Sequence, residues 1–118
     1  MTVEFELNGQ PFTALNGGPL FQFTEAVSFQ IMCQTQGEVD HYWKQLSDGG
    51  DPKAQQCGWL KDKYGLSWQV VPTVLTELMS APDREAAGRV MEAMLPMKKL
   101  DIAVLQRAFE GETAGARR

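Results

Sequence analysis

The spacing of apolar residues changes at Pro72, and this change predicts two kinds of structure in one chain. Before Pro72, apolar residues largely alternate with polar ones, which is typical of half-buried strands. After Pro72 they recur every three or four residues, which is typical of amphipathic helices. The sequence therefore predicts an α+β fold with strands first and a helical C-terminal region.

An N-terminal hairpin is the first predicted element. Residues 3–7 place three apolar side chains on one face and two glutamates on the other. The pair Asn8-Gly9 follows, and it is preferred in two-residue hairpin turns because both positions take positive φ. Residues 10–15 form the second strand, and Pro11 indicates a sheet edge because proline cannot donate a ladder hydrogen bond.

Two further regions predict the main sheet. Residues 26–33 have an apolar face and a mixed face, so we expect a central strand whose mixed face forms a pocket wall. Residues 54–61 and 66–71 flank a turn at 62–65 with the spacing of a hairpin. On this prediction, Trp59 and Trp68 pack against each other across the hairpin.

One helix is predicted between the strands. Thr35 and Glu38 have the spacing of a capping box. The helix that they start runs to about Ser47, where a stretch rich in glycine and proline ends it. Four of its residues have helical spacing and are expected to face the sheet: Val39, Tyr42, Trp43 and Leu46.

Three more helices are predicted at residues 73–80, 83–95 and 101–110, with Gly111 ending the last. Residues 112–118 are expected to be frayed. Four methionines fall in this region, and we favour a role in filling gaps of a core over the alternative of a flexible interaction surface. They are Met79, Met91, Met94 and Met97.

The composition excludes several classes of function. A chain of 118 residues predicts one domain. Its net charge of −4 and the lack of a basic stripe argue against a nucleic-acid partner. No apolar run approaches the roughly 18 residues of a membrane-spanning helix, and the acidic, alternating start is unlike a signal peptide, so a cytoplasmic location is expected. No glycine-rich nucleotide signature supports a common cofactor site.

The reactive side chains are given structural roles. His41, the only histidine, falls on the exposed side of the predicted helix, and a catalytic base is the less favoured alternative because it would need a fixed partner. Cys57 is interpreted as a buried strand cysteine rather than a reactive thiol, since only Lys61 and Lys63 lie near it in sequence. Cys33 is placed in the core. Both thiols are expected to be free, with a disulfide between strands as the less favoured alternative.

Several motifs together resemble one known family. They are Asn8-Gly9-Gln10-Pro11-Phe12, Gly17-Gly18-Pro19, Cys57-Gly58-Trp59 with Asp62 and Gly65, Trp68-Gln69 with Val71-Pro72, and Met97-Lys98-Lys99-Leu100-Asp101. The chain resembles the PhnB-like branch of the vicinal-oxygen-chelate superfamily (glyoxalase, bleomycin-resistance and dioxygenase proteins), often labelled demethylubiquinone methyltransferases. The resemblance covers nearly the whole chain. It implies a βαβββ-type module whose curved mixed sheet cups a small-molecule pocket, with the N-terminal hairpin and the C-terminal helices added to it.

The resemblance also implies a domain organisation. Residues 1–118 form a single domain, in which residues 1–19 resemble the end of a first module, 20–72 form the second module, and 73–111 form the C-terminal helices. An isolated two-stranded hairpin is not stable in water. We therefore expect the hairpin to extend the main sheet or to pair with another chain, in a homodimer that exchanged strands could form.

Two departures from the family pattern predict a pocket without a metal or other cofactor. In metal-using relatives, a glutamate on the last strand of the module and a histidine early on its first strand are typical ligands. Gln69 and Ser28 stand at those positions here. An amide and a hydroxyl are poor ligands for a divalent transition metal. Methyltransferase activity has no support, because no cofactor-binding loop of a usual methyltransferase is present.

The predicted function is therefore the binding of a small molecule, with no catalytic residue assigned. The pocket is expected to combine polar groups from the mixed strand faces with aromatic walls, to which Phe21 adds another. One alternative is a metal-dependent lyase, isomerase or dioxygenase with ligands from Glu4, Glu6, Glu25 or the partner's His41. The other alternative is a structural or protein-interaction domain. The six predicted pocket residues are Ser28, Gln30, Trp59, Ser67, Trp68 and Gln69.

Overall fold

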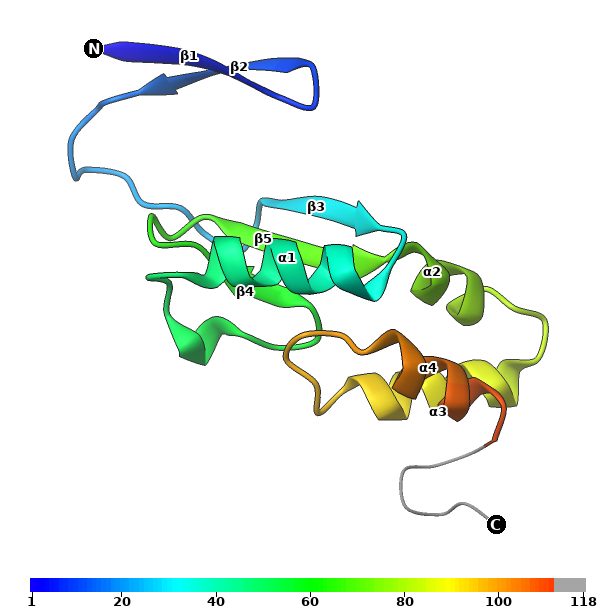
Figure 1. Cartoon of the computed structure of the whole chain (residues 1–118). Coiled ribbons are helices and arrows are strands. Elements are labelled where there is room, and N and C mark those ends of the chain that lie inside the picture. Colours follow the sequence, from blue (N-terminus) through cyan, green and yellow to red (C-terminus); the bar gives the residue numbers. More distant parts are fainter. Residues whose placement is uncertain (112–118) are drawn as a thin grey trace.

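A computed structural model describes residues 1–111 of the chain, and the predicted frayed end at 112–118 lies outside the described residues. The described part consists of a two-stranded hairpin, a three-stranded sheet covered by one long helix, and a group of three helices (Figure 1). Its principal extents are 60 × 29 × 24 Å and its radius of gyration is 16.8 Å. A compact domain of this length would have a radius of gyration of about 13.5 Å. The molecule is elongated because the hairpin stands apart from the rest (Figure 1).

The hairpin consists of β1 (Thr2–Leu7) and β2 (Gln10–Leu15), joined by the predicted turn. Asn8 and Gly9 have φ values of 51° and 81°, as a two-residue turn of this type requires. Phe5 and Phe12 are paired across the strands, and their rings stack with centroids 5.6 Å apart. The hairpin forms a sheet of its own, so within one chain it does not extend the main sheet.

The main sheet is mixed and has the strand order β3-β5-β4. The strand β3 (Ser28–Cys33) runs parallel to β5 (Ser67–Pro72), and β4 (Trp59–Lys61) runs antiparallel to β5. The prediction that residues 26–33 form the central strand was wrong. The strand β4 pairs with one edge of β5, and β3 pairs with the other edge. The central strand is therefore β5, and β3 is an edge strand.

The strand predicted at 54–61 is much shorter than expected. A 3₁₀ turn (Pro52–Ala54) comes first, and β4 starts only at Trp59. Cys57 and Gly58 have φ values of 52° and 87°, and this left-handed pair breaks the extended conformation. Cys57 is therefore a half-buried residue of a tight turn, and its prediction as a buried strand cysteine was wrong.

The two tryptophans of the β4–β5 hairpin do not pack against each other as predicted. Trp59 pairs with Gln69, whereas Trp68 pairs with Leu60. Paired positions put their side chains on the same face of a sheet, so the two indoles lie on opposite faces. Trp68 packs instead against Phe29 of β3, with ring centroids 5.4 Å apart in an edge-to-face arrangement.

The helix α1 (Gln36–Ser47) covers one face of the sheet. Thr35 caps it as predicted, since the Thr35 hydroxyl accepts a hydrogen bond from the Glu38 amide at 3.1 Å. Val39 is fully buried and is the centre of the contact. Tyr42 was predicted to face the sheet but is 40% exposed. The core under α1 consists of Cys33, Val39, Leu60 and Val70, flanked by Ile31, Trp43, Leu46 and Trp68.

The C-terminal helices form at the predicted places, as α2 (Thr73–Met79), α3 (Arg84–Met94) and α4 (Ile102–Phe109). Gly111 has a φ of 91° and follows the end of α4. These helices enclose a second core around Val90, Leu100 and Leu105, beside the sheet rather than over its open face (Figure 1). Three of the four methionines pack against this core as predicted, and Met91 is 38% exposed. Among residues 1–111, no helix has the length and apolar character needed to cross a membrane.

A short segment, residues 97–100, joins the two cores. The amides of Cys57 and Gly58 donate hydrogen bonds to the carbonyls of Met97 and Lys98 at 2.7 and 2.8 Å. A Cβ on Gly58 would lie 3.0 Å from the Leu100 side chain, so only glycine allows this close approach. The positive φ of the Cys57-Gly58 turn thus lets this turn dock on the C-terminal region.

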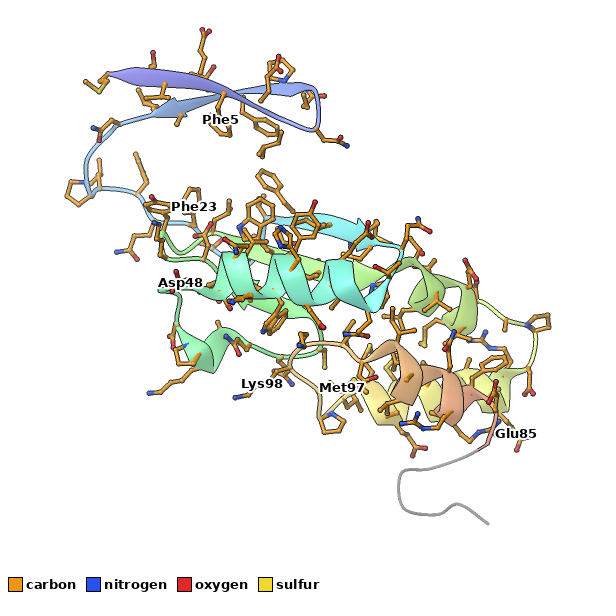
Figure 2. All side chains as sticks on the ribbon, viewed as in Figure 1. Phe5, Phe23, Asp48, Glu85, Met97 and Lys98 are labelled. Carbon is orange, nitrogen blue, oxygen red and sulfur yellow. The ribbon has the colours of Figure 1, made fainter. Side chains whose placement is uncertain are left out.

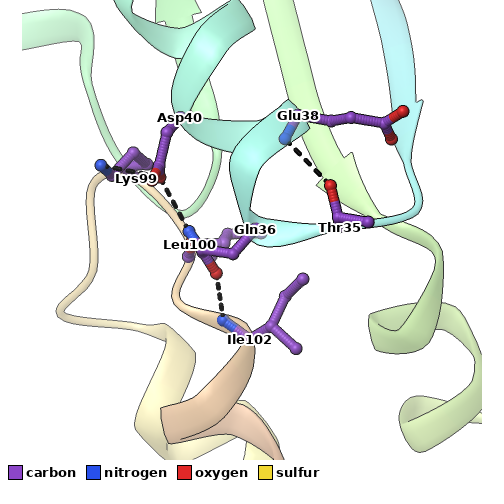
Figure 3. Close-up of polar contacts among 7 residues, drawn as sticks. All are labelled: Thr35, Gln36, Glu38, Asp40, Lys99, Leu100 and Ile102. Carbon is purple, nitrogen blue, oxygen red and sulfur yellow. Dashed lines mark hydrogen bonds and ion pairs between the residues drawn. The ribbon is translucent and has the colours of Figure 1, made fainter.

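Gln36 makes a second connection, at the start of α1 (Figure 3). Its amide nitrogen donates to the Leu100 carbonyl at 3.0 Å, and its amide oxygen accepts from the Ile102 amide at 2.8 Å. Lys99 and Asp40 add an ion pair of 2.9 Å on the surface nearby. The helical group is therefore held against α1 by side-chain hydrogen bonds as well as by the docked turn.

Candidate functional site

The face of the sheet opposite α1 carries most of the predicted pocket residues. Cross-strand pairing aligns two rows of side chains on it, because residues in register share a face. One row contains an indole and two amides, and the other an amine and two hydroxyls. In strand order β4-β5-β3, the rows are Trp59, Gln69 and Gln30, and then Lys61, Ser67 and Ser28.

Three of these polar side chains are hydrogen-bonded to one another. The Gln69 amide nitrogen donates to the Ser28 hydroxyl at 2.9 Å. The Gln30 amide nitrogen donates to the Gln69 carbonyl oxygen at 3.3 Å. The hydroxyl proton of Ser28 and the carbonyl oxygen of Gln30 are left for other partners, and Gln30 is exposed. The face therefore offers both a donor and an acceptor.

Ser67 is the buried member of the second row. It is 1% exposed, and its hydroxyl has no hydrogen-bond partner among the described residues. A buried polar group without a partner costs about 1–3 kcal/mol. Ser67 thus has unused hydrogen-bonding capacity directly beneath the open face.

A cleft of about 1040 Å³ lies between the hairpin and the edge strand β3. It takes in both faces of β3, because no strand covers the outer edge of β3 in the described residues. Of the six predicted pocket residues, Ser28, Gln30 and Trp68 line this cleft, whereas Trp59, Ser67 and Gln69 lie farther across the sheet. The remaining lining residues are Leu7, Asn8, Gln10, Phe12, Phe29, Ile31, Met32, Glu38, Tyr42 and Leu46.

Aromatic side chains connect the two walls of the cleft. Phe5 lies on the side of the hairpin that faces the sheet (Figure 2) and stacks on Phe12. The Phe12 ring contacts the Phe29 ring of β3 with centroids 5.7 Å apart, and Phe29 in turn contacts Trp68. Since β1 and β2 bring Phe12 over β3, the hairpin supplies a wall that the sheet lacks.

Trp68 is held firmly in its place by the turn that precedes β5. Its indole nitrogen donates to one Asp62 carboxylate oxygen at 2.9 Å. The other carboxylate oxygen accepts from the amides of Tyr64 and Leu66 at 2.9 and 3.0 Å. Asp62 therefore fixes both the turn and the ring, so the aromatic wall is formed before any ligand arrives.

The electrostatic character of the cleft is set by one carboxylate. Glu38 is the only charged residue among the described residues that line it. One Glu38 oxygen accepts a hydrogen bond from the Gln34 amide at 2.6 Å. On the open face, Lys61 is paired with Glu25 at 2.7 Å, and this pairing lowers the pKa of Glu25. Within residues 1–111, the cleft thus has no lining cation to bind an anionic ligand.

The side chains of the described residues do not fit a metal centre. Within residues 1–111, no group of three histidine, cysteine, aspartate or glutamate side chains is arranged to hold a metal ion. Ser28 and Gln69 are hydrogen-bonded to each other, and a hydroxyl and an amide are poor donors for transition metals. His41 is exposed on α1, with its ring against Tyr42 at a centroid distance of 5.1 Å.

Several residues of the cleft were missed from the sequence. Asn8 was interpreted only as a turn residue, and Phe12 and Phe29 only as strand residues. Tyr42 was assigned to the buried face of α1, but it is 40% exposed and lines the cleft. An available signal was the aromatic character of Phe12 on a strand without a partner sheet, since a lone hairpin has no core for it to enter.

Together, the mixed sheet, the covering helix and the cleft beside an open face define an α+β protein with a cleft at the edge of its sheet. A family model for 3-demethylubiquinone-9 3-methyltransferase matches residues 1–71. The chain belongs to this family, and the resemblance to PhnB-like proteins is confirmed. A comparison with curated proteins found no match.

A solved structure supports the same assignment. The PhnB protein from Bacillus cereus, which carries the name of a 3-demethylubiquinone-9 3-methyltransferase, is 34% identical to this chain with a TM-score of 0.53. The match covers 62% of this chain and 64% of that protein, so this chain spans less than two thirds of its length. The α+β fold is confirmed, with a hairpin, a mixed three-stranded sheet and C-terminal helices. The βαβββ module implied by the resemblance is not complete in the described residues, because only β4 and β5 follow α1, and the 3₁₀ turn at Pro52–Ala54 and the turn after it replace the first part of the strand predicted at 54–61.

Proposed function

We propose that this protein binds a small molecule in the cleft between the hairpin and β3. The observation that carries the proposal is the composition of the cleft, which combines aromatic walls with a few exposed polar groups. Ligand sites usually have a volume of about 300–1000 Å³ and mostly apolar linings with a small number of polar groups. At about 1040 Å³, the cleft is large enough for a molecule with several rings.

The walls favour a flat, ring-containing ligand. Phe12 and Phe29 come from opposite walls, and Trp68 lies behind Phe29 with its indole fixed by Asp62. Aromatic rings stack on one another or meet edge to face, and such pairs add about 0.5–1.5 kcal/mol beyond the burial of their surface. A planar ring that binds beside Phe29 would gain free energy from the burial of its surface and from the contact between the rings.

The polar groups favour a ligand that has a donor and an acceptor. The free Gln30 carbonyl oxygen accepts, and the Ser28 hydroxyl donates, because the Gln69 amide already occupies an acceptor position of that hydroxyl. The charge of Glu38 favours neutral or cationic ligands over anionic ones. The proposed ligand is therefore a neutral or cationic aromatic molecule with a carbonyl or amine group.

We propose binding without a metal and without methyl transfer. The donors at positions 28 and 69 are a hydroxyl and an amide, which support hydrogen bonding better than metal coordination. The name of the Bacillus cereus protein describes that protein. Among the described residues, we assign no side chain to a site for a methyl donor. Binding of a small molecule accounts for the cleft without an assigned reaction.

A thermal-shift titration with three matched probes tests the proposal. Quinolin-2-one is neutral at pH 7 and has an N–H donor beside its carbonyl acceptor, N-methylquinolinium is a cation, and quinoline-2-carboxylate is an anion of similar size. We expect the first two to raise the melting temperature, because a ligand that binds the native state stabilises it. No shift with any of them, at concentrations up to their solubility, would contradict the proposed site.

Two glutamine variants locate the binding. Gln30→Ala should weaken the binding of the neutral probe about tenfold, because a lost hydrogen bond costs about 1–1.5 kcal/mol. Gln106→Ala, on the exposed side of α4 and away from the cleft, is the matched control and should leave binding unchanged. Equal losses in both variants would place the ligand elsewhere.

A further inference from the structure

We propose that Lys61 and Ser67 form a second binding site, for an aromatic monocarboxylate, on the open face of the sheet. Glu25, on the segment between β2 and β3, is paired with Lys61 and is displaced when such a ligand binds. The site is separate from the cleft between the hairpin and β3. It does not depend on the ligand proposed for that cleft.

The first observation is the buried hydroxyl of Ser67. Cross-strand pairing places this residue between Lys61 of β4 and Ser28 of β3, so the three side chains share the open face. Ser67 is 1% exposed, and its hydroxyl has no hydrogen-bond partner among residues 1–111. Most buried polar groups in folded proteins have a partner, because burial without one is unfavourable. The hydroxyl is therefore free to donate its proton to an acceptor placed beside Lys61.

The second observation is the ammonium group beside that hydroxyl. Lys61 pairs directly with Ser67 in the register of β4 with β5, and its side chain is 29% exposed. A carboxylate has two oxygens that accept hydrogen bonds. One oxygen can bind the Lys61 ammonium while the other accepts from the Ser67 hydroxyl, and hydrogen bonds to charged groups are stronger than those between neutral groups. The pair thus fits a single carboxylate.

The third observation is that a carboxylate of the chain itself already binds Lys61. One Glu25 oxygen lies 2.7 Å from the Lys61 ammonium nitrogen, while the Ser67 hydroxyl receives no bond from Glu25. The Glu25 side chain is 67% exposed and comes from a segment without strand or helix. Exposed ion pairs contribute little net stability. A ligand carboxylate that uses both donors can therefore displace Glu25.

Trp59 favours an aromatic body for this ligand. It precedes Lys61 by two residues in β4, so both side chains lie on the open face. Its indole is half-buried and offers a surface on which a ring can stack. The cleft carries the charge of Glu38 instead, so an anion is favoured at Lys61 and disfavoured in the cleft.

Calorimetric titration with benzoate tests the site. Benzoate should bind the full chain with a dissociation constant of about 1 mM or lower, as is reasonable for so small a ligand. Benzamide has nearly the same shape without the charge, and it should bind at least about tenfold more weakly. No saturable binding of benzoate, or equal binding of the two probes, would overturn the proposal.

Two lysine variants locate the charge. Lys61→Met keeps the length of the side chain and should weaken benzoate binding at least about tenfold. Lys63→Met removes the same charge from the exposed turn two residues further on, and should leave binding unchanged. Equal losses in the two variants would mean that benzoate responds only to the net charge, and this result would overturn the site.

Ser67→Ala separates ligand binding from structural support. The variant removes a buried hydroxyl without a partner, so its melting temperature should be equal to or above that of the wild-type protein. Benzoate binding should nevertheless weaken about tenfold, because one hydrogen bond to a charged group is lost. Unchanged affinity in this variant would show that Ser67 does not contact the ligand.

Glu25→Gln should have the opposite effect on affinity. The substitution removes the competing carboxylate from Lys61, so benzoate should bind about two- to fivefold more tightly. Weaker binding in Glu25→Gln would show that Glu25 does not compete with the ligand, and it would overturn the displacement.

The two sites are told apart by their variants. Gln30→Ala, at the cleft, should leave benzoate binding unchanged, and Lys61→Met should leave the binding of quinolin-2-one unchanged. Any thermal shift with quinoline-2-carboxylate should disappear in Lys61→Met and persist in Gln30→Ala. A benzoate affinity that falls in Gln30→Ala as much as in Lys61→Met would overturn the separate site.

Discussion

The Gln69 amide nitrogen donates a hydrogen bond to the Ser28 hydroxyl at 2.9 Å, and this bond joins the central strand to the edge strand on the open face of the sheet. The two residues are 41 positions apart in sequence and lie diagonally across one face of the sheet, because Gln69 pairs with Gln30 and Ser28 pairs with Ser67. From the resemblance, metal-using relatives are expected to have a glutamate and a histidine at these two positions. The amide and the hydroxyl found here are close enough for a hydrogen bond.

We expect two substitutions at these positions to create metal affinity. Ser28→His together with Gln69→Glu would place an imidazole and a carboxylate side by side, which are common zinc ligands. The double variant should bind Zn²⁺ at least about 100-fold more tightly than the wild-type protein, as measured by calorimetry. Each single variant should be much weaker than the double variant. Equal affinity in the wild-type protein would show that its own donors suffice.

Two glycines should respond in opposite ways to alanine. A Cβ at position 50 would lie 2.0 Å from the Lys61 carbonyl oxygen, so the backbone must shift. Gly50→Ala should lower the free energy of unfolding by about 2–4 kcal/mol. Gly88→Ala, in α3 with no atom within 4 Å of its Cβ, should raise it by about 0.5–1 kcal/mol. Urea denaturation measures both, and similar effects would contradict this part of the structure.

Removal of the Gln36 side chain should loosen the C-terminal helices. Gln36→Ala leaves the Leu100 carbonyl and the Ile102 amide without their partner, at a cost of about 1–3 kcal/mol. The amides of α4 should then exchange hydrogen faster than those of β5. Lys99→Ala removes only an exposed ion pair and should cost at most about 0.5 kcal/mol. A larger loss of stability in Lys99→Ala than in Gln36→Ala would contradict the role of Gln36 in connecting α1 to the C-terminal region.

The two free thiols should differ strongly in reactivity. Cys33 is 1% exposed, and burial, together with the charge of Glu38, raises the pKa of its thiol. Cys57 is half-buried in a turn, with its sulfur 3.4 Å from the Leu95 carbonyl oxygen. A disulfide reagent at pH 8 should modify Cys57 quickly and Cys33 only in denaturant. Cys57→Ser should abolish the fast phase, and persistence of that phase would contradict the burial of Cys33.

Acid should weaken the surface contact at Asp40 in a defined pH range. Hydrogen bonds from Gln36, and then from Lys99, lower the pKa of Asp40 from its ordinary value of 3.8. A carboxyl with a lowered pKa in the folded state contributes stability above its unfolded pKa and loses it as the pH falls. Asp40→Asn should therefore flatten the pH dependence of unfolding below pH 3.8, by a small amount because the group is exposed. Asp48→Asn, at the end of the same helix, is the control.

Much of the candidate site could not be predicted from local patterns. The polar faces of residues 26–33 and 66–71 were evident from alternation, and cross-strand pairing confirms that Ser28, Gln30, Ser67 and Gln69 share a face. The face occupied by Trp68 was assigned wrongly relative to Trp59, because a shift of one residue in register moves a side chain to the other face. The contribution of the hairpin to the cleft depends on a contact between Phe12 and Phe29 that no local pattern encodes.

The sequence by itself determined the elements whose causes are local. The Asn8-Gly9 turn follows from two residues that accept positive φ. The Thr35 cap, the Asp62–Gly65 turn and the starts of α3 and α4 follow from side chains within four residues of the backbone groups that they satisfy. Only the tertiary structure decided that β3 is an edge strand, that the Cys57-Gly58 turn docks on residues 97–100, and that Gln69 meets Ser28. These features depend on hydrogen bonds and packing between distant segments, whose free energy appears only when the chain has brought those segments together.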